Sequence, residues 1–341
     1  MSSISTSLIR FNTFGLPAHC RQLVLARTQA ELMAACMQHA VDDVPPLILG
    51  GGSNLLLLED YLGTVIKVET KGITVSEDSE HYRLTVAAGE SWHGLVEFCL
   101  QQNIAGLENL ALIPGTVGAA PIQNIGAYGV EFSAVCDWVE YLDLNTGKLV
   151  RLSHDECQFS YRYSVFKGAL RGRAVVLQVG IVLTKCWQPN LTYGSLQSLA
   201  GQATPQAVFD TVCRVRSEKL PAPEQMGNVG SFFENPVVSA EHFSQLQLRY
   251  ANIVGYPQPS GEVKLAAGWL IDSLGLKGYS VGGAAVHQQQ ALVLVNRGNA
   301  TSSDVLGLAR LICQRVKAAF EVELVMEPRV YAARGEWSNV L

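Results

Sequence analysis

The stretch that decides the fold is residues 114–129, which read Pro114-Gly115-Thr116-Val117-Gly118-Ala119-Ala120-Pro121-Ile122-Gln123-Asn124-Ile125-Gly126-Ala127-Tyr128-Gly129. Its glycines and small side chains let the backbone pass close to another group, and glycine adopts positive φ angles readily. Backbone N–H groups exposed in such a turn, especially where a helix begins, form a cradle for phosphate oxygens. We therefore expect a phosphate-binding loop, with a tightly packed turn that holds no ligand as the alternative.

A second glycine-rich turn lies upstream, where an apolar run at 46–49 predicts a buried strand that leads into Gly50-Gly51-Gly52-Ser53-Asn54. The spacing fits neither the Rossmann GxGxxG fingerprint nor a Walker P-loop. Two glycine loops together suit a long ligand with a pyrophosphate at its middle.

The composition indicates a compact protein with large cores. Of the 341 residues 48% are hydrophobic and 16% are charged, against about 25% charged in an average globular protein. A chain of this length predicts two or three domains. The formal net charge of -5 argues against a general nucleic-acid surface.

Cysteine usage and the N-terminus predict a cytoplasmic protein. The eight cysteines are scattered without a CxxC pair, which favours reduced core thiols over a zinc site or a disulfide framework. Residues 1–10 lack the apolar core of a signal peptide, and no run approaches the roughly 20 apolar residues of a membrane span. His287 has no second ligand at metal-site spacing, so we expect no metal.

Alternating strand and helix signals predict a mixed α/β architecture. We expect strands at 22–26, 64–68, 82–87, 174–183, 281–288 and 291–296, and a hairpin over 138–152. Helices are expected at 28–40 (with a Thr28/Glu31 capping box), 91–102, 205–219 and 302–320. Lys264 is expected to enter a helix, and Glu327 to end a strand before Pro328.

Three residues stand in patterns that suit chemistry. Arg162 lies among aromatic residues, which hold a guanidinium in a fixed direction for a bidentate carboxylate contact. Ser231 precedes two phenylalanines and lacks a GxSxG elbow, which favours a proton donor over a nucleophile. Glu327 is a carboxylate among apolar residues. Each has an ordinary alternative: a surface arginine over its neighbours, a serine bonded to its own turn, and an exposed edge charge.

These segments together resemble the UDP-N-acetylenolpyruvoylglucosamine reductases, and the resemblance extends over almost the whole chain. The residues and segments that carry it are Asn12-Thr13-Phe14-Gly15, 50–54, 114–129, Tyr161-Arg162, Gly230-Ser231-Phe232-Phe233, 264–268 and Glu327-Pro328. A loop at Tyr193 is similar to that of the longer class of these enzymes, in which the tyrosine closes over the substrate.

The resemblance implies an α+β fold with an FAD-binding module of the vanillyl-alcohol oxidase type, made of two α/β subdomains, and a C-terminal α/β substrate-binding domain. The expected division is 1–68 for the first FAD subdomain, joined by 324–341, then 69–218 for the second and 219–323 for the substrate domain. The implied partners are UDP-N-acetylglucosamine enolpyruvate and NADPH, the implied cofactor is non-covalent FAD, and the enzyme is expected to be a monomer.

The implied reaction has two halves, in which NADPH gives a hydride to FAD and the enolpyruvyl group then receives one. Arg162 and Glu327 would stabilise the negative charge that develops beside the carboxylate. Ser231 would protonate the adjacent carbon.

The resemblance also assigns binding residues. FAD is expected on Gly51, Gly52, Ser53, Asn54, Gly115, Thr116, Gly118, Ala119, Asn124, Ile125, Gly126 and Tyr128. The substrate is expected on Tyr193, Lys219 and Asn235 at its diphosphate, with Arg216, Tyr256, Lys264 and Gln290 as further participants.

Two positions depart from the family pattern. Glu234 stands where relatives carry lysine, and Arg329 where a second glutamate is common; we expect both to be compatible with activity. The rival hypotheses are a flavin oxidase, in which a histidine such as His93 holds FAD covalently, and a sugar-nucleotide-binding protein without catalysis.

Overall fold

A computed structural model describes residues 6–337, which form two compact units. The first unit comprises Thr6, Cys20–Gly52 and Leu62–Glu218. The second comprises Ser7–His19, Ser53–Tyr61 and residues 219–337. The finer division of the FAD module at residue 68 stays a prediction.

The first unit contains two main sheets, a two-stranded ribbon and three α-helices. One sheet has the order β1 (Thr6–Ser7), β2 (His19–Ala26), β5 (Tyr61–Val68), β3 (Leu47–Leu49). The other has the order β11 (Leu149–Ser153), β10 (Cys136–Asp143), β12 (Ala174–Thr184), β7 (His81–Ala87), β6 (Ile73–Glu77). The ribbon is β8 (Gly126–Ala127) with β9 (Val130–Glu131), and the helices are α1 (Gln29–His39), α2 (Trp92–Gln101) and α3 (Pro205–Lys219).

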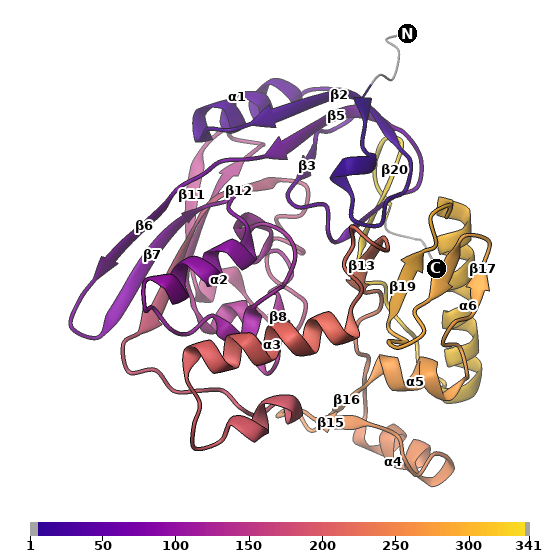
Figure 1. Cartoon of the computed structure of the whole chain (residues 1–341). Coiled ribbons are helices and arrows are strands. Elements are labelled where there is room, and N and C mark those ends of the chain that lie inside the picture. The colour runs from indigo at the N-terminus through magenta and orange to yellow at the C-terminus, as the bar shows by residue number, and fades with distance from the viewer. Residues whose placement is uncertain (1–5, 338–341) are drawn as a thin grey trace. The chain divides into compact units, whose positions relative to one another are not determined.

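The helix starts of this unit follow the predicted capping signals. Thr28 and Glu31 form the capping box of α1, and the Ser91 hydroxyl accepts from the Gly94 N–H at the start of α2. Such caps satisfy N–H groups that have no partner within the helix. Figure 1 shows α1 alongside β2 and β5. The predicted helices at both positions are confirmed.

The five-stranded sheet is antiparallel and contributes buried residues to the first unit's core, chiefly from β10 and β12. The predicted hairpin is confirmed, because β10 pairs with β11 from Trp138 opposite Ser153 to Leu142 opposite Leu149. The central strand β12 pairs with both β10 and β7, and seven of its eleven residues are buried. A strand buried on both faces reads as a continuous apolar run, which is how its sequence predicted it.

The second unit contains three small sheets and three α-helices. The sheets have the orders β13 (Asn228–Ser231), β19 (Val293–Asn296), β18 (Ala284–Val286), β17 (Ser280–Val281); β14 (Val237–Val238), β16 (Val263–Leu265), β15 (Gly255–Pro257); and β21 (Gly335–Glu336), β20 (Arg329–Ala332), β4 (Leu55–Leu57). The helices are α4 (Ala240–Arg249), α5 (Ala267–Ser273) and α6 (Ser302–Phe320).

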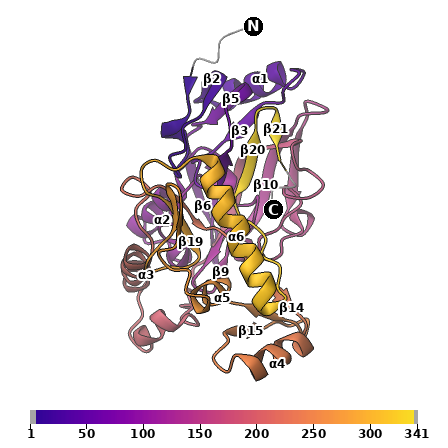
Figure 2. The ribbon, with the colours of Figure 1, turned by 90° about the vertical axis from the view of Figure 1, so that its right-hand side faces the viewer.

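Helix α6 organises the core of the second unit. Its buried face includes Val305, Leu308, Ile312, Val316 and Phe320, at helical steps of three and four. Figure 2 shows α6 running beside β19, and its contacts include β17 and β18. The bounds predicted for this helix are confirmed.

The N-terminal Asn-Thr-Phe-Gly segment is part of the same unit. The Thr13 hydroxyl donates to the Asn228 carbonyl over 2.7 Å, and the Asn296 amide donates to the Phe14 carbonyl over 3.0 Å. These bonds anchor the segment against β13 and β19, so its part in the fold is to support the strand that ends at Ser231.

Three predictions in the second unit were wrong in detail. Lys264 lies within β16 rather than in a helix, and α5 begins only at Ala267. The strand expected at 281–288 is interrupted at Gly282, whose φ of 53° turns the chain between β17 and β18. Before Pro328 the chain forms only an isolated bridge between Met326 and Phe233, and the regular strand β20 begins after it, at Arg329.

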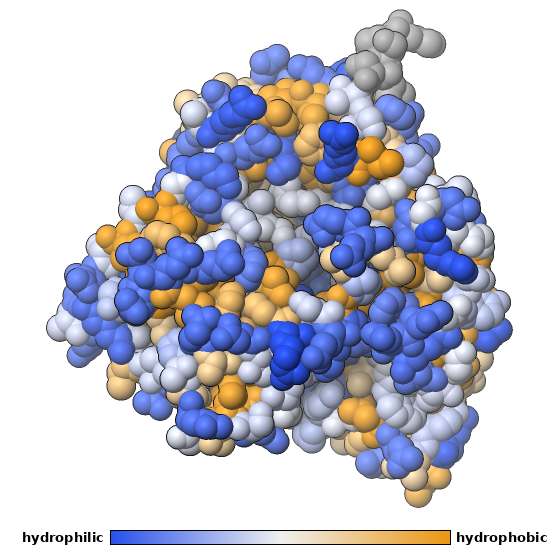
Figure 3. Space-filling model, viewed as in Figure 1, coloured by the Kyte–Doolittle hydropathy of each residue, from blue (hydrophilic) through white to orange (hydrophobic). Residues whose placement is uncertain are grey.

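No helix within residues 6–337 is long and apolar enough to cross a membrane. On the face that Figure 3 shows, hydrophilic side chains dominate, and apolar ones are exposed in separate small patches.

Candidate functional site

The two glycine-rich loops of the sequence meet in the first unit. A Cβ atom placed on Gly51 would lie 2.6 Å from the Cα of Gly115, closer than real Cβ atoms approach a backbone. Only two glycines permit this backbone-to-backbone contact. The structure therefore joins the end of β3 and the loop after α2 into one surface made of main chain.

The N–H groups of the second loop fall into two sets. Those of Val117 and Gly118 donate to the carbonyl oxygens of Glu90 and Ala88, both over 2.9 Å. Within residues 6–337 the N–H groups of Gly115 and Thr116 donate no hydrogen bond. Open N–H groups beside a surface that any Cβ would fill are a donor set for phosphate oxygens.

The loop does not open an α-helix. Val117–Ala119 forms a single 3₁₀ turn. A Cβ on Gly118 would lie 2.5 Å from the Cβ of Ala88, so Gly118 serves close packing between the loop and β7. Open backbone donors, rather than a helix terminus, give this loop its anion-binding capacity.

The Asn124 side chain supports the second half of the loop through hydrogen bonds in the protein interior. It is fully buried, and its Nδ2 donates to the Glu131 carboxylate over 2.8 Å and to the Ser160 carbonyl over 3.1 Å. Its Oδ1 accepts from the Ser133 N–H over 2.8 Å. Neither Glu131 nor Ser160 was identified from the sequence, because no local pattern predicts contacts across 7 and 36 residues.

Arg162 lies at the tip of a two-residue turn. Ser160 and Tyr163 exchange backbone hydrogen bonds of 3.1 Å, and Arg162 has a φ of 54°. Its guanidinium carbon lies 5.0 Å from the centroid of the Tyr161 ring, and its Nη2 donates to the Gly126 carbonyl over 3.3 Å. The aromatic neighbourhood expected for this arginine is present.

Three of the predicted ligand residues cluster at the other end of the loop. The rings of Tyr128 and Tyr193 meet edge to face with centroids 4.8 Å apart. Burial raises the pKa of Tyr128 to about 12, so its phenol stays protonated at neutral pH. Burial lowers the pKa of Arg216, which is influenced electrostatically by both tyrosines. Its Nε is buried and has no hydrogen-bond partner among the described residues.

Asn109 joins the two segments that carry these tyrosines. Its Nδ2 donates to the carbonyl oxygens of Tyr128 and Asn190, both over 2.9 Å. Tyr193 itself is 42% exposed. An anchored segment that carries an exposed ring is suited to contacting a ligand from solvent, and Asn109 is a supporting residue that the sequence did not indicate.

In the second unit, Ser231 and Glu327 lie on adjacent segments. Ser231 ends β13, and the Glu327 N–H donates to the carbonyl of the next residue, Phe232, over 3.0 Å. The Phe232 and Phe233 rings are buried, with centroids 5.2 Å apart. They fix the backbone that carries Ser231, as the sequence pattern predicted.

Asn54 is attached to the same segment as Glu327. Its Nδ2 donates to the Glu327 carbonyl over 3.4 Å, and its own carbonyl accepts from the Arg329 N–H over 3.0 Å. Within the second unit the structure thus groups Asn54, Ser231 and Glu327.

Four of the predicted substrate ligands of the second unit, Asn235, Tyr256, Lys264 and Gln290, lie in or near β16 and the start of α5. Lys264 stands between its cross-strand partners Val237 and Tyr256. The Asn235 Oδ1 accepts from the Ala267 N–H over 2.9 Å at the start of α5. The Gln290 Oε1 would lie 3.4 Å from a Cβ on Gly268, in the same helix. Lys219 is exposed at the end of α3.

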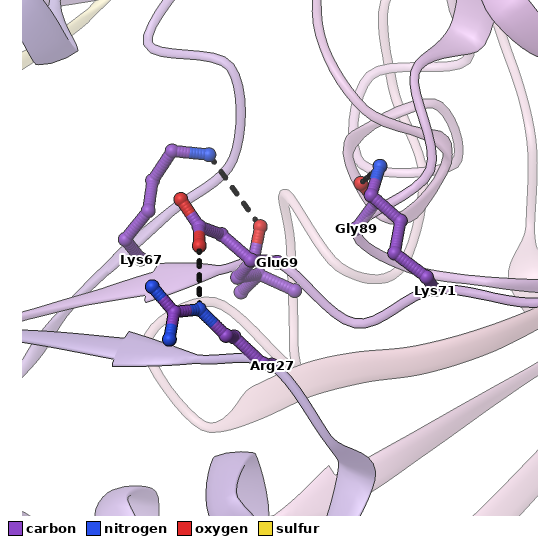
Figure 4. A pocket seen from close by; sticks show the side chains of 6 residues that line it. Arg27, Lys67, Glu69, Lys71 and Gly89 are labelled. Atoms are coloured by element: carbon purple, nitrogen blue, oxygen red, sulfur yellow. Dashed lines mark hydrogen bonds and ion pairs between the residues drawn. The ribbon is translucent and has the colours of Figure 1, made fainter.

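A pocket of about 420 Å³ lies at the carboxyl ends of strands in the first unit, and Figure 4 shows its charged side chains. Burial lowers the pKa of Lys67 there. Lys71 donates to the Gly89 carbonyl over 2.7 Å, and the Arg27 Nε lies 3.7 Å from Glu69. Because these cations are matched by groups of the protein, we assign the pocket no ligand.

Comparisons with known proteins agree with this geometry. A family model described as an FAD binding domain matches residues 20–153, and one described as the C-terminal domain of UDP-N-acetylenolpyruvoylglucosamine reductase matches residues 222–331. These ranges contain both glycine loops and the segments of Ser231 and Glu327, respectively.

Relatives of the same name match nearly the full length. The chain is 57% identical to UDP-N-acetylenolpyruvoylglucosamine reductase of Shewanella sp. (strain ANA-3), covering 98% of this chain and 99% of the relative. It is 51% identical to that of Salmonella typhimurium, covering 98% of each. The crystal structure of the Thermus caldophilus enzyme is similar with a TM-score of 0.64 at 25% identity, over 95% of this chain and 97% of that one. The chain therefore belongs to the UDP-N-acetylenolpyruvoylglucosamine reductase family.

Proposed function

We propose how this reductase divides its reaction among its own side chains. The enzyme reduces the enolpyruvyl group of UDP-N-acetylglucosamine enolpyruvate to the lactyl ether of UDP-N-acetylmuramate, a peptidoglycan precursor, at the expense of NADPH. Bound FAD supplies hydride transfer between NADPH and the enolpyruvyl carbon. The preference for NADPH over NADH rests on the family alone.

The first unit's glycine surface fits the pyrophosphate of FAD. The backbone contact of Gly51 with Gly115 and the open N–H groups of Gly115 and Thr116 support this assignment. We propose FAD contacts from Gly51, Gly52, Ser53, Asn54, Gly115, Thr116, Ala119, Ile125, Gly126 and Tyr128. Gly118 and Asn124 would contribute through the shape of the loop.

Arg162 is proposed to bind the substrate carboxylate and to stabilise the charge that develops next to it. When a hydride reaches the distal enolpyruvyl carbon, negative charge accumulates beside the existing carboxylate. A guanidinium fork bonds a carboxylate through two parallel N–H groups, and a donor fixed in place needs no reorganisation as the charge appears. Contacts with the Tyr161 ring and the Gly126 carbonyl support such fixing.

Ser231 is proposed to deliver the proton to the adjacent carbon, and Glu327 to stabilise the enolate intermediate by hydrogen bonding. The single observation that carries this assignment is the bond from the Glu327 N–H to the Phe232 carbonyl, which supports it by pairing the segments that carry the two residues. Neither residue would have a use in a sugar-nucleotide-binding protein without catalysis.

The substrate diphosphate is proposed to contact Tyr193, Lys219 and Asn235. Lysine is a flexible point charge that suits a phosphate group. Arg216, Tyr256, Lys264 and Gln290 would contact the rest of the nucleotide sugar. The buried Arg216 Nε without a partner supports a ligand at that position.

We further propose that the enzyme is cytoplasmic, since NADPH and nucleotide sugars are intracellular compounds. We also propose that it is a monomer. Light scattering of the purified protein should then give a mass close to 36.9 kDa. A mass twice that value would contradict the monomer.

Ser231→Ala tests the proposed roles. We expect flavin reduction by NADPH to remain near normal, and oxidation of the flavin by the enolpyruvyl substrate to fall at least 100- to 1,000-fold. Ser231→Cys keeps a weak proton donor and should recover part of the lost rate. An unchanged second half-reaction in Ser231→Ala would overturn the proton-donor role.

A further inference from the structure

We infer that Asn124 is a positioning residue, which holds Arg162 in register with the flavin loop through its amide. The inference rests on the proposed role of Arg162. It assigns to Asn124 a function in the second half-reaction rather than a contact with FAD.

The hydrogen bonds of Asn124 lie inside the protein. Both amide hydrogens are engaged, by Glu131 and by the Ser160 carbonyl, while Oδ1 accepts from Ser133. A side-chain amide has two N–H donors, and this side chain is 0% exposed. Its donors are therefore not available to a ligand.

The bond to Ser160 acts on the turn that carries Arg162. The Ser160 carbonyl accepts from the Tyr163 N–H over 3.1 Å and closes that turn. Asn124 donates to the same oxygen from the side of the flavin loop. The amide therefore holds the base of the turn that carries Arg162 at its tip. The guanidinium of Arg162 is the proposed catalytic group.

Two further bonds join the same segments. The Ser164 hydroxyl donates to the Ile122 carbonyl over 2.7 Å, and Arg162 Nη2 donates to the Gly126 carbonyl over 3.3 Å. The loop at 122–126 and the turn at 160–164 are thus joined at three places. The side chains of Asn124 and Ser164 are both fully buried, whereas Arg162 is partly exposed.

Backbone conformation explains why such support is needed. Arg162 has a φ of 54° and Asn124 a φ of 48°. The left-handed region is unfavourable for an arginine and persists where the surroundings over-determine it. Without the amide of Asn124, the turn loses one of these constraints, and a misplacement of about 1 Å at a reacting group can cost about 100-fold in rate.

The test is a double-mutant cycle in the full-length, FAD-loaded enzyme. Asn124→Gly removes the amide and still tolerates the positive φ, and it is combined with Arg162→Ala. FAD content, the rate of flavin reduction by NADPH and the single-turnover rate with the enolpyruvyl substrate are measured for all four proteins. Asn103→Gly is the control, because Asn103 also has a positive φ of 57° and lies far from this network in sequence.

We expect Asn124→Gly to keep its FAD, to be reduced by NADPH within about threefold of the wild-type rate, and to lose about 30- to 100-fold in the second half-reaction. In the Arg162→Ala enzyme, the same change should slow the second half-reaction by less than about twofold. The reason is that the effects of residues acting through one another are not additive. Asn103→Gly should match the wild type in all three measurements.

Other outcomes overturn the inference in distinguishable ways. If Asn124→Gly slows the second half-reaction of the Arg162→Ala enzyme as much as that of the wild type, Asn124 acts independently of Arg162. Loss of FAD from Asn124→Gly would make Asn124 a determinant of flavin binding, and an unchanged second half-reaction would leave it no role in positioning. A wild-type rate in Arg162→Ala alone would instead refute the proposed function of Arg162.

Discussion

Gly51 and Gly115 lie in backbone contact, so that a Cβ on the first would stand 2.6 Å from the Cα of the second. The two residues are 64 positions apart, and each lies in a glycine-rich loop. Their contact turns two separate sequence signals into one surface of main chain. The account of FAD binding depends on this surface more than on any side chain.

Gly51→Ala should therefore weaken FAD binding. The added methyl group has no space unless the loops separate, and overpacking of this kind costs about 1–3 kcal/mol. If this cost applies to the FAD-bound conformation of the loops, the dissociation constant for FAD rises roughly 5- to 150-fold. Titration of the apoprotein with FAD, followed by flavin fluorescence, measures this change.

A matched glycine substitution should leave FAD binding unchanged. In Gly307→Ala, the new Cβ would lie 3.5 Å from Val281, an ordinary contact, within helix α6. Because alanine is the better helix former, unfolding should become harder by about 0.5–1 kcal/mol. Equal FAD affinities in Gly51→Ala and Gly307→Ala would refute the steric account of the cradle.

Glu327→Ala should impair the chemistry without loss of FAD. Removal of a group that stabilises developing charge typically costs about 100- to 1,000-fold in rate, and flavin reduction by NADPH should be spared. Glu323→Ala is a nearby control, since Glu323 is exposed and paired with Lys317 over 2.7 Å. If Glu327→Ala instead purifies without flavin, Glu327 supports the scaffold and is not a catalytic residue.

FAD should be released from the enzyme by acid. His93, the histidine nearest to the loops in sequence, is already engaged: its Nδ1 accepts from the Leu112 N–H over 3.1 Å, and its ring stacks on Phe209. After precipitation with trichloroacetic acid, we expect the yellow colour in the supernatant. Colour that stays in the protein pellet would indicate a covalent flavin.

Glu234→Lys should tighten substrate binding. Glu234 is adjacent to Asn235, a proposed diphosphate ligand, and it introduces an acid where relatives carry lysine. Exchanging the charge should lower KM a few-fold at low ionic strength, with a smaller effect in high salt because salt screens the charge of a partly exposed residue such as Glu234. Steady-state kinetics at two salt concentrations test this; a higher KM in the variant would place the side chain away from the diphosphate.

The Asp143–Arg173 pair should make the first unit sensitive to acid. The Arg173 guanidinium lowers the pKa of Asp143, which also accepts the Asn145 N–H over 2.9 Å at the hairpin turn. A carboxyl with a depressed folded-state pKa stabilises the fold above its unfolded value, about 3.8, and loses that contribution as the pH falls. Asp143→Asn should thus have a lower free energy of unfolding than the wild type at pH 7. This gap between the two proteins should narrow towards pH 3.5.

Urea denaturation at both pH values measures this gap. Asp155→Asn is the control, because the Asp155 side chain is 98% exposed, and surface substitutions of this kind usually change stability by less than about 0.5 kcal/mol. A gap for Asp143→Asn that does not vary with pH would contradict the electrostatic explanation.

The sequence predicted those parts of the fold that are encoded locally. Thr28 and Glu31 form the capping box of α1, and the apolar steps of α6 mark its buried face. Lys264 was misplaced because the three-residue strand β16 is too short to show a period, and its conformation is decided by pairing with β14 and β15.

The supporting residues of the site could not be predicted in the same way. Glu131, Ser160 and Asn109 act through hydrogen bonds that join distant segments, and nothing in their immediate sequence marks them. The departure at Arg329 is explained only by the structure, in which its Nε donates to Glu336 over 2.7 Å.

The visible spectrum of the purified enzyme under anaerobic conditions tests the central claim most directly. It is recorded before NADPH, after NADPH, and after addition of UDP-N-acetylglucosamine enolpyruvate. We predict that NADPH bleaches the flavin absorbance and that the enolpyruvyl substrate restores it. Bleaching that the substrate does not reverse would contradict the proposed second half-reaction, and a protein that neither contains nor binds flavin would contradict the phosphate cradle formed by Gly51 and Gly115.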